Sequence, residues 1–145
     1  SKNIDLINDT NVTVVDPENI YDDTYDIISP CALGGTINRN SLKNINCNII
    51  AGAANNQLEN DIDVPEELLK KNILYIPDFL INAGGIISVY HEQINDIDSK
   101  KVMDMTGLIY DKVSSVIKYS EENSISTNSS AIQLAKDRIK ENSKK

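Results

Sequence analysis

Three short segments of this sequence combine small residues with polar or apolar neighbours in a mixture suited to holding a ligand against the main chain. They are S-P-C-A-L-G-G at residues 29–35, A-G-A-A-N-N-Q-L at 51–58 and P-D-F-L-I-N-A-G-G at 77–85. Glycine and alanine let a ligand approach the backbone, and an asparagine amide offers a donor and an acceptor together. The chemistry that these segments indicate is the binding and orientation of a ligand.

A purely structural explanation is open for two of the segments. Gly34-Gly35 and Asn55-Asn56 could each be ordinary turn formers, because turns favour these residues. The stretch Asn82 to Gly85 is harder to explain in this way, since two adjacent glycines at a helix-compatible position cost roughly 1 kcal/mol each relative to alanine. That cost favours a need for close approach to the backbone.

The other candidates for chemistry are weaker. His91 is the only histidine, near the end of a helix expected after Pro77, and without a paired nucleophile we expect a partly exposed structural role for it. Cys31 directly follows a predicted strand, but no histidine is close in sequence, so the lining of a cleft explains it better than catalysis. The carboxylates show no recognisable spacing of metal ligands, and we expect no metal.

Short apolar runs predict four strands, three of which lead directly into these segments. The expected strands are Val12–Val15, Tyr25–Ser29, Asn48–Ala51 and Leu74–Ile76. Between them, residues 36–45 could form a short helix and residues 65–71 a better one, with glutamates early and lysines late. Strands that alternate with helices predict a doubly wound, parallel α/β sheet. In such sheets, ligands bind outside the carboxyl ends of the strands, where all three segments fall.

The last third of the sequence changes to helical periodicity. Apolar residues recur at three- and four-residue spacing from Val102 to Ile117, which predicts an amphipathic helix. Ser130 has capping-box spacing with Gln133, which predicts the start of a second helix. We expect one domain over residues 1–145, with an α/β part at about 11–97 and carboxyl-terminal helices at about 98–142.

Charge and cysteine content limit the possible partners. The 14 basic and 22 acidic residues give a formal charge of −8, which repels phosphate backbones and anionic membranes, so we expect neither nucleic acid nor a membrane as a partner. One pyrophosphate could still be held by local backbone N–H groups. The sequence has no apolar run long enough to cross a bilayer and no signal-peptide pattern. Its two cysteines make a poor disulfide framework, so we expect a cytoplasmic location.

In order and spacing, the three segments resemble those of the glutamate/leucine/phenylalanine/valine dehydrogenase family, and specifically its leucine dehydrogenase-like branch. The resemblance extends from about residue 11 to residue 140. It implies a partial Rossmann-type domain that binds NAD. The full protein would oxidatively deaminate a branched-chain L-amino acid: hydride leaves the α-carbon for NAD, and water attacks the resulting imine.

The resemblance also implies roles for particular residues. Cys31, Ala32 and Leu33 would line the cofactor cleft. Asn55 and Asn82 would lie near the nicotinamide and bond its carboxamide, its ribose or the substrate. The amino-acid side-chain pocket would be lined by Ile86 and Val89, whose aliphatic nature favours a branched-chain substrate over glutamate. For either of these two, packing in the core is nearly as good an explanation.

Two departures from the family pattern bear on activity. The glycine-rich pyrophosphate turn and the acidic residue that follows it are missing, as is the amino-terminal substrate domain with its catalytic lysines and aspartate. We therefore expect a fragment with no catalytic residues, inactive alone, whose full-length form is a homo-oligomer. An open strand edge would make the fragment prone to aggregation. A phenylalanine dehydrogenase-like specificity, or a non-catalytic remnant that no longer binds NAD, remain as alternatives.

Overall fold

The computed structural model describes residues 12–96 and 98–143. The expected domain limits at residues 11 and 97 fall outside the described residues. In chain order the elements are η1 (Pro17–Asn19), β1 (Thr24–Ile28), η2 (Ser41–Lys43), β2 (Asn46–Ile50), α1 (Asp63–Lys70), β3 (Leu74–Tyr75), α2 (Asp78–Ile81), α3 (Gly84–Gln93), α4 (Ser99–Gly107), α5 (Ile109–Asn123) and α6 (Thr127–Asn142).

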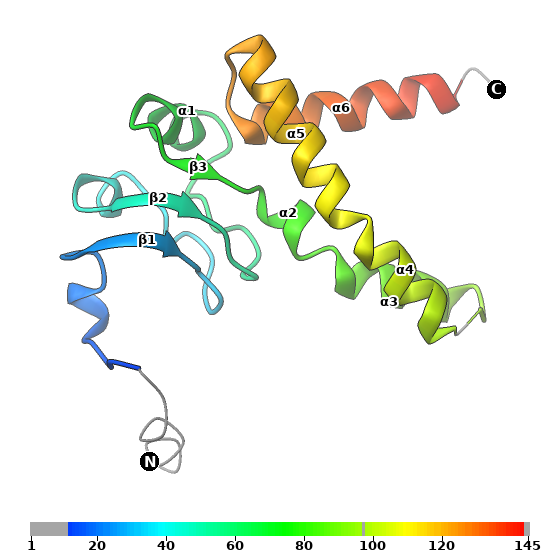
Figure 1. The fold of residues 1–145 in the computed structure, drawn as a ribbon, viewed down its shortest axis with the longest axis horizontal. Helices are drawn as coiled ribbons and strands as arrows, with labels where there is room; N and C mark the ends of the chain where they lie inside the picture. The colour runs from blue at the N-terminus through cyan, green and yellow to red at the C-terminus, as the bar shows by residue number, and fades with distance from the viewer. Residues whose placement is uncertain (1–11, 97, 144–145) are drawn as a thin grey trace.

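The three strands form one parallel sheet in the order β1-β2-β3. Ile27 lies opposite Ile49 across the first pair, and Ile50 lies opposite Tyr75 across the second. Consecutive parallel strands need crossovers, and α1 makes the one between β2 and β3. The predicted parallel α/β sheet of partial Rossmann type is therefore confirmed, and Figure 1 shows β1 at its outer edge, away from α1 and α6.

The core lies between the sheet and α1. Its fully buried members include Ile37, Ile50, Val64 and Leu68. Burying a side chain of this kind stabilises the fold by roughly 1.5–3 kcal/mol. This cluster holds the carboxyl ends of the strands, and so the loops that follow them, in a fixed arrangement.

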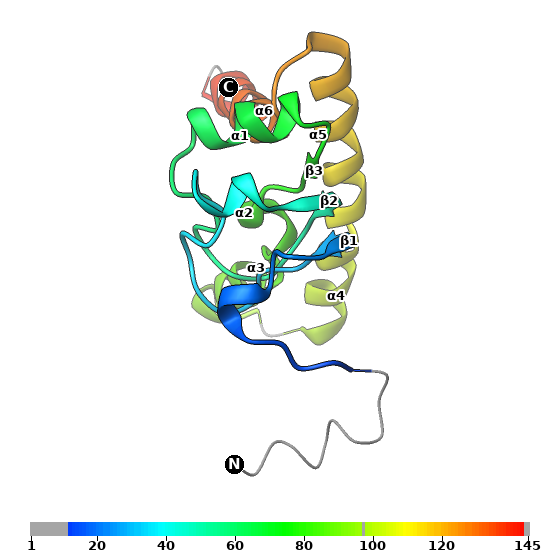
Figure 2. The same cartoon turned by 90° about the vertical axis from the view of Figure 1, so that its left-hand side faces the viewer.

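The later helices are joined to the α/β part through α6 and extend away from it. The hydroxyl of Thr127, in the first turn of α6, donates to the carbonyl of Tyr75 in β3. The α5 helix packs along α6 and against α2, and α3 packs on α4. Figure 1 shows α3 and α4 beyond α2, on the side away from β1, and Figure 2 shows them apart from α1 and α6.

Two predictions in the α/β part are wrong. Val12–Val15 is not a strand: no strand lies beside it within residues 12–96 and 98–143, and Val14 is 72% exposed. A strand needs a hydrogen-bonding neighbour as well as β-branched residues. The helix expected at residues 36–45 is only the short η2, because the Asn38 side chain accepts bonds from the N–H groups of Asn40 and Ser41 and so turns the chain there.

The helical part was predicted with the right content but with errors in its limits. The helix expected from Val102 to Ile117 is interrupted at Leu108, next to the weak helix former Gly107, and the helix expected after Pro77 is interrupted at residues 82–83.

The last helix begins earlier than its predicted cap. The N-cap is Ser126, whose hydroxyl accepts from the N–H of Ser129, whereas Ser130 is completely buried in the first turn. Because all five residues of the stretch 126–130 are serine, threonine or asparagine, any of which can cap a helix, spacing alone did not identify the cap. None of the helices in residues 12–96 and 98–143 is long and apolar enough to cross a membrane.

Candidate functional site

The first two strand-end segments touch through their main chains. The N–H of Ala54 donates a hydrogen bond to the carbonyl of Pro30 at 2.9 Å. A Cβ atom added at Gly52 would lie 2.1 Å from that carbonyl oxygen, so only glycine allows this approach. The contact joins the loops that follow β1 and β2, as the sequence predicted for strands whose ends meet at one edge.

A second contact fixes the loop that carries the asparagines. The N–H of Gly35 donates to the carbonyl of Asn56 at 2.8 Å, and a Cβ atom at Gly34 would lie 2.8 Å from the carbonyl oxygens of Asn55 and Asn56. Gly35 and Asn56 have left-handed backbones, with φ of 68° and 52°, which glycine and asparagine tolerate best. These residues do form turns, and the turns also bring the two segments together.

The third segment meets the second through two side-chain amides. Asn82 Nδ2 donates to Asn55 Oδ1 at 2.6 Å and to the carbonyl of Ala53 at 3.3 Å. Among the described residues, neither Asn55 Nδ2 nor Asn82 Oδ1 has a further partner. The pair therefore presents one free amide donor and one free carbonyl acceptor, with Asn55 exposed.

The segment from Cys31 to Leu33 lies beside the outer edge of β1. All three of its residues are exposed, and they line a cleft of about 840 Å³ that runs along that edge. A hydrogen bond with the Ser29 hydroxyl, followed by one with the backbone of Ala53, lowers the pKa of the Cys31 thiol. The residues lining this cleft do not include either asparagine of the pair.

On α3, the two predicted pocket residues face outward. Ile86 is 72% exposed and Val89 is 49% exposed, so core packing within the described residues does not explain them. A Cβ atom at Gly84 would meet the Thr106 methyl group at an ordinary 3.5 Å, and one at Gly85 would meet nothing within 4 Å. No contact with the described residues requires this glycine pair. Neither Ile86 nor Val89 lines the cleft beside β1.

Two residues of the segments have a place in the site that sequence reasoning missed. Gln57 is completely buried and Asp78 is 8% exposed, although both are polar. The N–H of Gln57 donates to Asp78 Oδ2 at 3.1 Å. The available signal was their position, directly after Asn55-Asn56 and directly after Pro77, in segments that were otherwise singled out.

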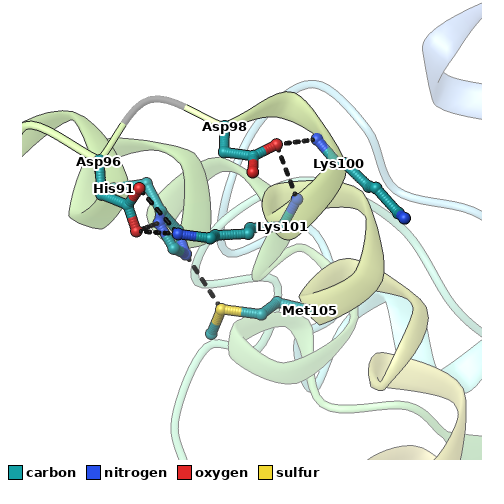
Figure 3. A network of polar contacts seen from close by, with 6 residues as sticks. All are labelled: His91, Asp96, Asp98, Lys100, Lys101 and Met105. Carbon is teal, nitrogen blue, oxygen red and sulfur yellow. Dashed lines mark hydrogen bonds and ion pairs between the residues drawn. The ribbon is translucent and has the colours of Figure 1, made fainter.

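His91 belongs to a separate network that joins α3 to α4 (Figure 3). The expected partial exposure is wrong, since His91 is only 6% exposed. Its Nε2 lies 3.1 Å from the sulfur of Met105, and its Nδ1 lies 3.9 Å from Asp96 Oδ2. Asp96 in turn accepts from Lys101 Nζ at 2.7 and 2.9 Å. The histidine is thus placed to hold two helices together, away from the asparagine pair.

A parallel sheet whose strand ends carry converging glycines and amides defines a partial Rossmann-type α/β domain. The glutamate/leucine/phenylalanine/valine dehydrogenase family model matches residues 2–145, and the chain belongs to this family of amino-acid dehydrogenases. The predicted family is confirmed.

The relatives differ in their substrates. The chain is 47% identical over 127 residues to an L-tryptophan dehydrogenase of Nostoc punctiforme, covering 88% of this chain and 36% of that protein. It is 38% identical to a phenylalanine dehydrogenase of Bacillus thermotolerans, over 92% of this chain and 35% of that one. It is 36% identical to a leucine dehydrogenase of Bacillus subtilis (strain 168), over 92% of this chain and 36% of that protein.

The crystal structure of the Nostoc punctiforme L-tryptophan dehydrogenase superposes with a TM-score of 0.86 at 44% identity, over 92% of this chain and 40% of that one. The chain thus spans about a third of the length of the curated relatives that it matches.

Proposed function

We propose that this chain supplies the nicotinamide side of the cofactor site in an NAD-dependent dehydrogenase that oxidatively deaminates an apolar L-amino acid. The observation that carries the proposal is the Asn55–Asn82 pair at the carboxyl ends of the strands. Its free donor, Asn55 Nδ2, and free acceptor, Asn82 Oδ1, match the carbonyl oxygen and the NH₂ group of a carboxamide. Bound NAD would accept the hydride from the α-carbon of the amino acid.

The chain's own residues would bind and orient rather than transfer protons, and we assign no catalytic residue to it. The asparagine pair would fix the carboxamide, and Cys31, Ala32 and Leu33, which follow β1 at the carboxyl edge of the sheet, would line the cofactor cleft. The open face at Gly85 leaves room for a ligand beside the start of α3.

The substrate side chain would contact Ile86 and Val89, one helical turn apart on α3. Two aliphatic, uncharged contacts favour leucine, valine or isoleucine over glutamate. An aromatic substrate, phenylalanine or tryptophan, is the second candidate, because the 47% identical relative is an L-tryptophan dehydrogenase.

The partner that completes the site would pack on the open edge of β1. A Rossmann-type sheet contains two halves, and the described residues form strands on only one side of β1. Ile27 is 58% exposed there, in the wall of the apolar cleft. We propose that the glycine-rich half and the amino-terminal catalytic domain lie against this edge, in a cytoplasmic homo-oligomer. The isolated chain would then be inactive.

The test is to express the chain joined to its upstream coding sequence and to measure NADH formation with leucine, valine, isoleucine, phenylalanine, tryptophan and glutamate. We expect activity with apolar substrates and little with glutamate. Replacing Asn82 with Asp, which turns an amide donor into an acceptor, should raise the KM for NAD. Absence of NADH formation with every substrate, together with no NAD binding near 1 mM (about −4 kcal/mol), would favour the non-catalytic remnant.

A further inference from the structure

Two buried polar side chains, Gln57 and Asp78, lie behind the asparagine pair and have no part in the proposed contacts with NAD. Gln57 has no exposed surface and Asp78 has 8%. A polar or charged group taken out of water destabilises a fold unless it is hydrogen-bonded. Their burial therefore needs a reason, and the bonds of the Asp78 carboxylate and of the Gln57 NH₂ group supply one. Gln57 Oε1 is buried without a hydrogen-bond partner among the described residues.

Gln57 braces the loop that leads into Asn55. Its Nε2 donates to the carbonyl of Gly52 at 2.7 Å and to that of Ala54 at 2.9 Å. The two acceptors fix the orientation of the amide, because the flipped form would place its oxygen against two other oxygens. The side chain thus ties the start of the loop to its end, on either side of Ala53, whose carbonyl accepts from Asn82.

Asp78 ties this loop to the turn that carries Asn82. Its Oδ2 accepts from the N–H of Gln57 at 3.1 Å, and its Oδ1 accepts from the N–H of Phe79 at 2.8 Å. Its own carbonyl accepts from the N–H of Asn82 at 2.9 Å. One residue therefore holds the asparagine loop with its carboxylate and Asn82 with its main chain.

Together these bonds close a ring: Gln57 to Asp78, Asp78 to Asn82, and Asn82 to Asn55, two residues before Gln57. We propose that Gln57 and Asp78 are positioning residues that set the distance and angle between the two asparagine amides. The proposal rests on the proposed function, since it concerns the same cofactor site. A carboxamide bound by two amides needs both at fixed positions, and misplacement by about 1 Å can cost about a hundredfold in rate.

The variant Asp78→Asn tests the ring with almost no change in shape. An asparagine at this position has one oxygen, which can accept from the N–H of Gln57 or of Phe79. Its NH₂ group then faces the other N–H, and two donors cannot bond each other, so one of the two hydrogen bonds is lost. In the complete enzyme we expect the KM for NAD to rise about tenfold or more, with a smaller change in the KM for the amino acid. The matched control is Asp63→Asn on α1, where the carboxylate is 54% exposed and pairs with Arg39.

A second variant, Gln57→Met, removes the side-chain donors but leaves the N–H of residue 57 free to bond Asp78. Its KM for NAD should rise as well. In the double variant the fold-increase in this KM should be smaller than the product of the two single-variant increases, because both residues act through one ring. Variants that melt earlier but bind NAD with an unchanged KM would overturn the proposal and leave a purely structural role.

A measurement without NAD separates this proposal from the proposed function. In NMR spectra of the complete enzyme without NAD, the side-chain NH₂ signals of Asn82 should report its short bond to Asn55. Asp78→Asn should shift these signals and Asp63→Asn should not. If they stay in place, the ring does not position the pair. If they shift while the complete wild-type enzyme shows no NAD-dependent activity, the proposed function is wrong, but the positioning of the two asparagine amides by the ring is supported.

Discussion

Replacing Gly52 with alanine adds one methyl group where two loops of the site are already in contact. The added carbon would lie 2.1 Å from the carbonyl oxygen of Pro30, 2.5 Å from its nitrogen and 2.7 Å from its carbonyl carbon. Unstrained carbon contacts lie at about 3.5–4 Å, so the two segments must separate by roughly 1 Å. Because all three atoms are backbone, no side chain can rotate away to relieve the overlap.

The expected cost has two parts. Overpacking of this kind destabilises a fold by about 1–3 kcal/mol, and a clash with backbone belongs at the upper end. Separating the loops also lengthens the 2.9 Å bond from Ala54 N–H to Pro30, which is worth about 1 kcal/mol. We therefore expect Gly52→Ala to lower the free energy of unfolding by about 3–4 kcal/mol, or the melting temperature by roughly 10 °C.

Gly85→Ala is the matched control, because a Cβ atom at Gly85 meets nothing within 4 Å and lies near the start of α3. It should stabilise the fold by up to about 1 kcal/mol through helix propensity. Urea unfolding followed by circular dichroism measures the stability of both variants in the complete enzyme. Equal stability of Gly52→Ala and the wild type would refute the reasoning from loop contact. In the complete enzyme, weaker NAD or substrate binding by Gly85→Ala would indicate that the open space at Gly85 is used by a ligand.

Three further outcomes follow from the packing and the charges. The Ser29 hydroxyl lowers the pKa of exposed Cys31, whereas burial raises the pKa of Cys47. Cys31 should therefore react with iodoacetamide at neutral pH before Cys47 does, and equal rates for the two thiols would contradict this. The hydrogen bond from Lys101 lowers the pKa of Asp96, so this bond stabilises the fold above the ordinary pKa of 3.8 and stops doing so as the pH falls through the lowered pKa. Lys101→Met should therefore destabilise the fold at pH 7 but not in acid, and urea unfolding at both pH values measures this difference. Leu68→Ala should cost about 2–5 kcal/mol, and Leu69→Ala much less, because the first is 1% and the second 38% exposed.

Much of the α/β part could be predicted because its signals are local. Runs such as Leu74–Ile76, ended by a proline, predict a strand correctly where a neighbouring strand is present, and the helix predicted at residues 65–71 is α1. The prediction was wrong at Val12–Val15, where the same local signal lacks a neighbouring strand. It was also wrong on the exposure of His91, because burial against α4 depends on a helix that follows later in the chain.

The sequence by itself determined the composition of the site: small residues and amides directly after three strands, in an order that identifies the family. Only the tertiary structure decided how they meet. Asn55 and Asn82 are 27 residues apart, and their contact depends on strand pairing and on the approach that Gly52 permits. The roles of Gln57 and Asp78 were hidden for the same reason, because the burial and bonds of a polar side chain depend on residues distant in sequence.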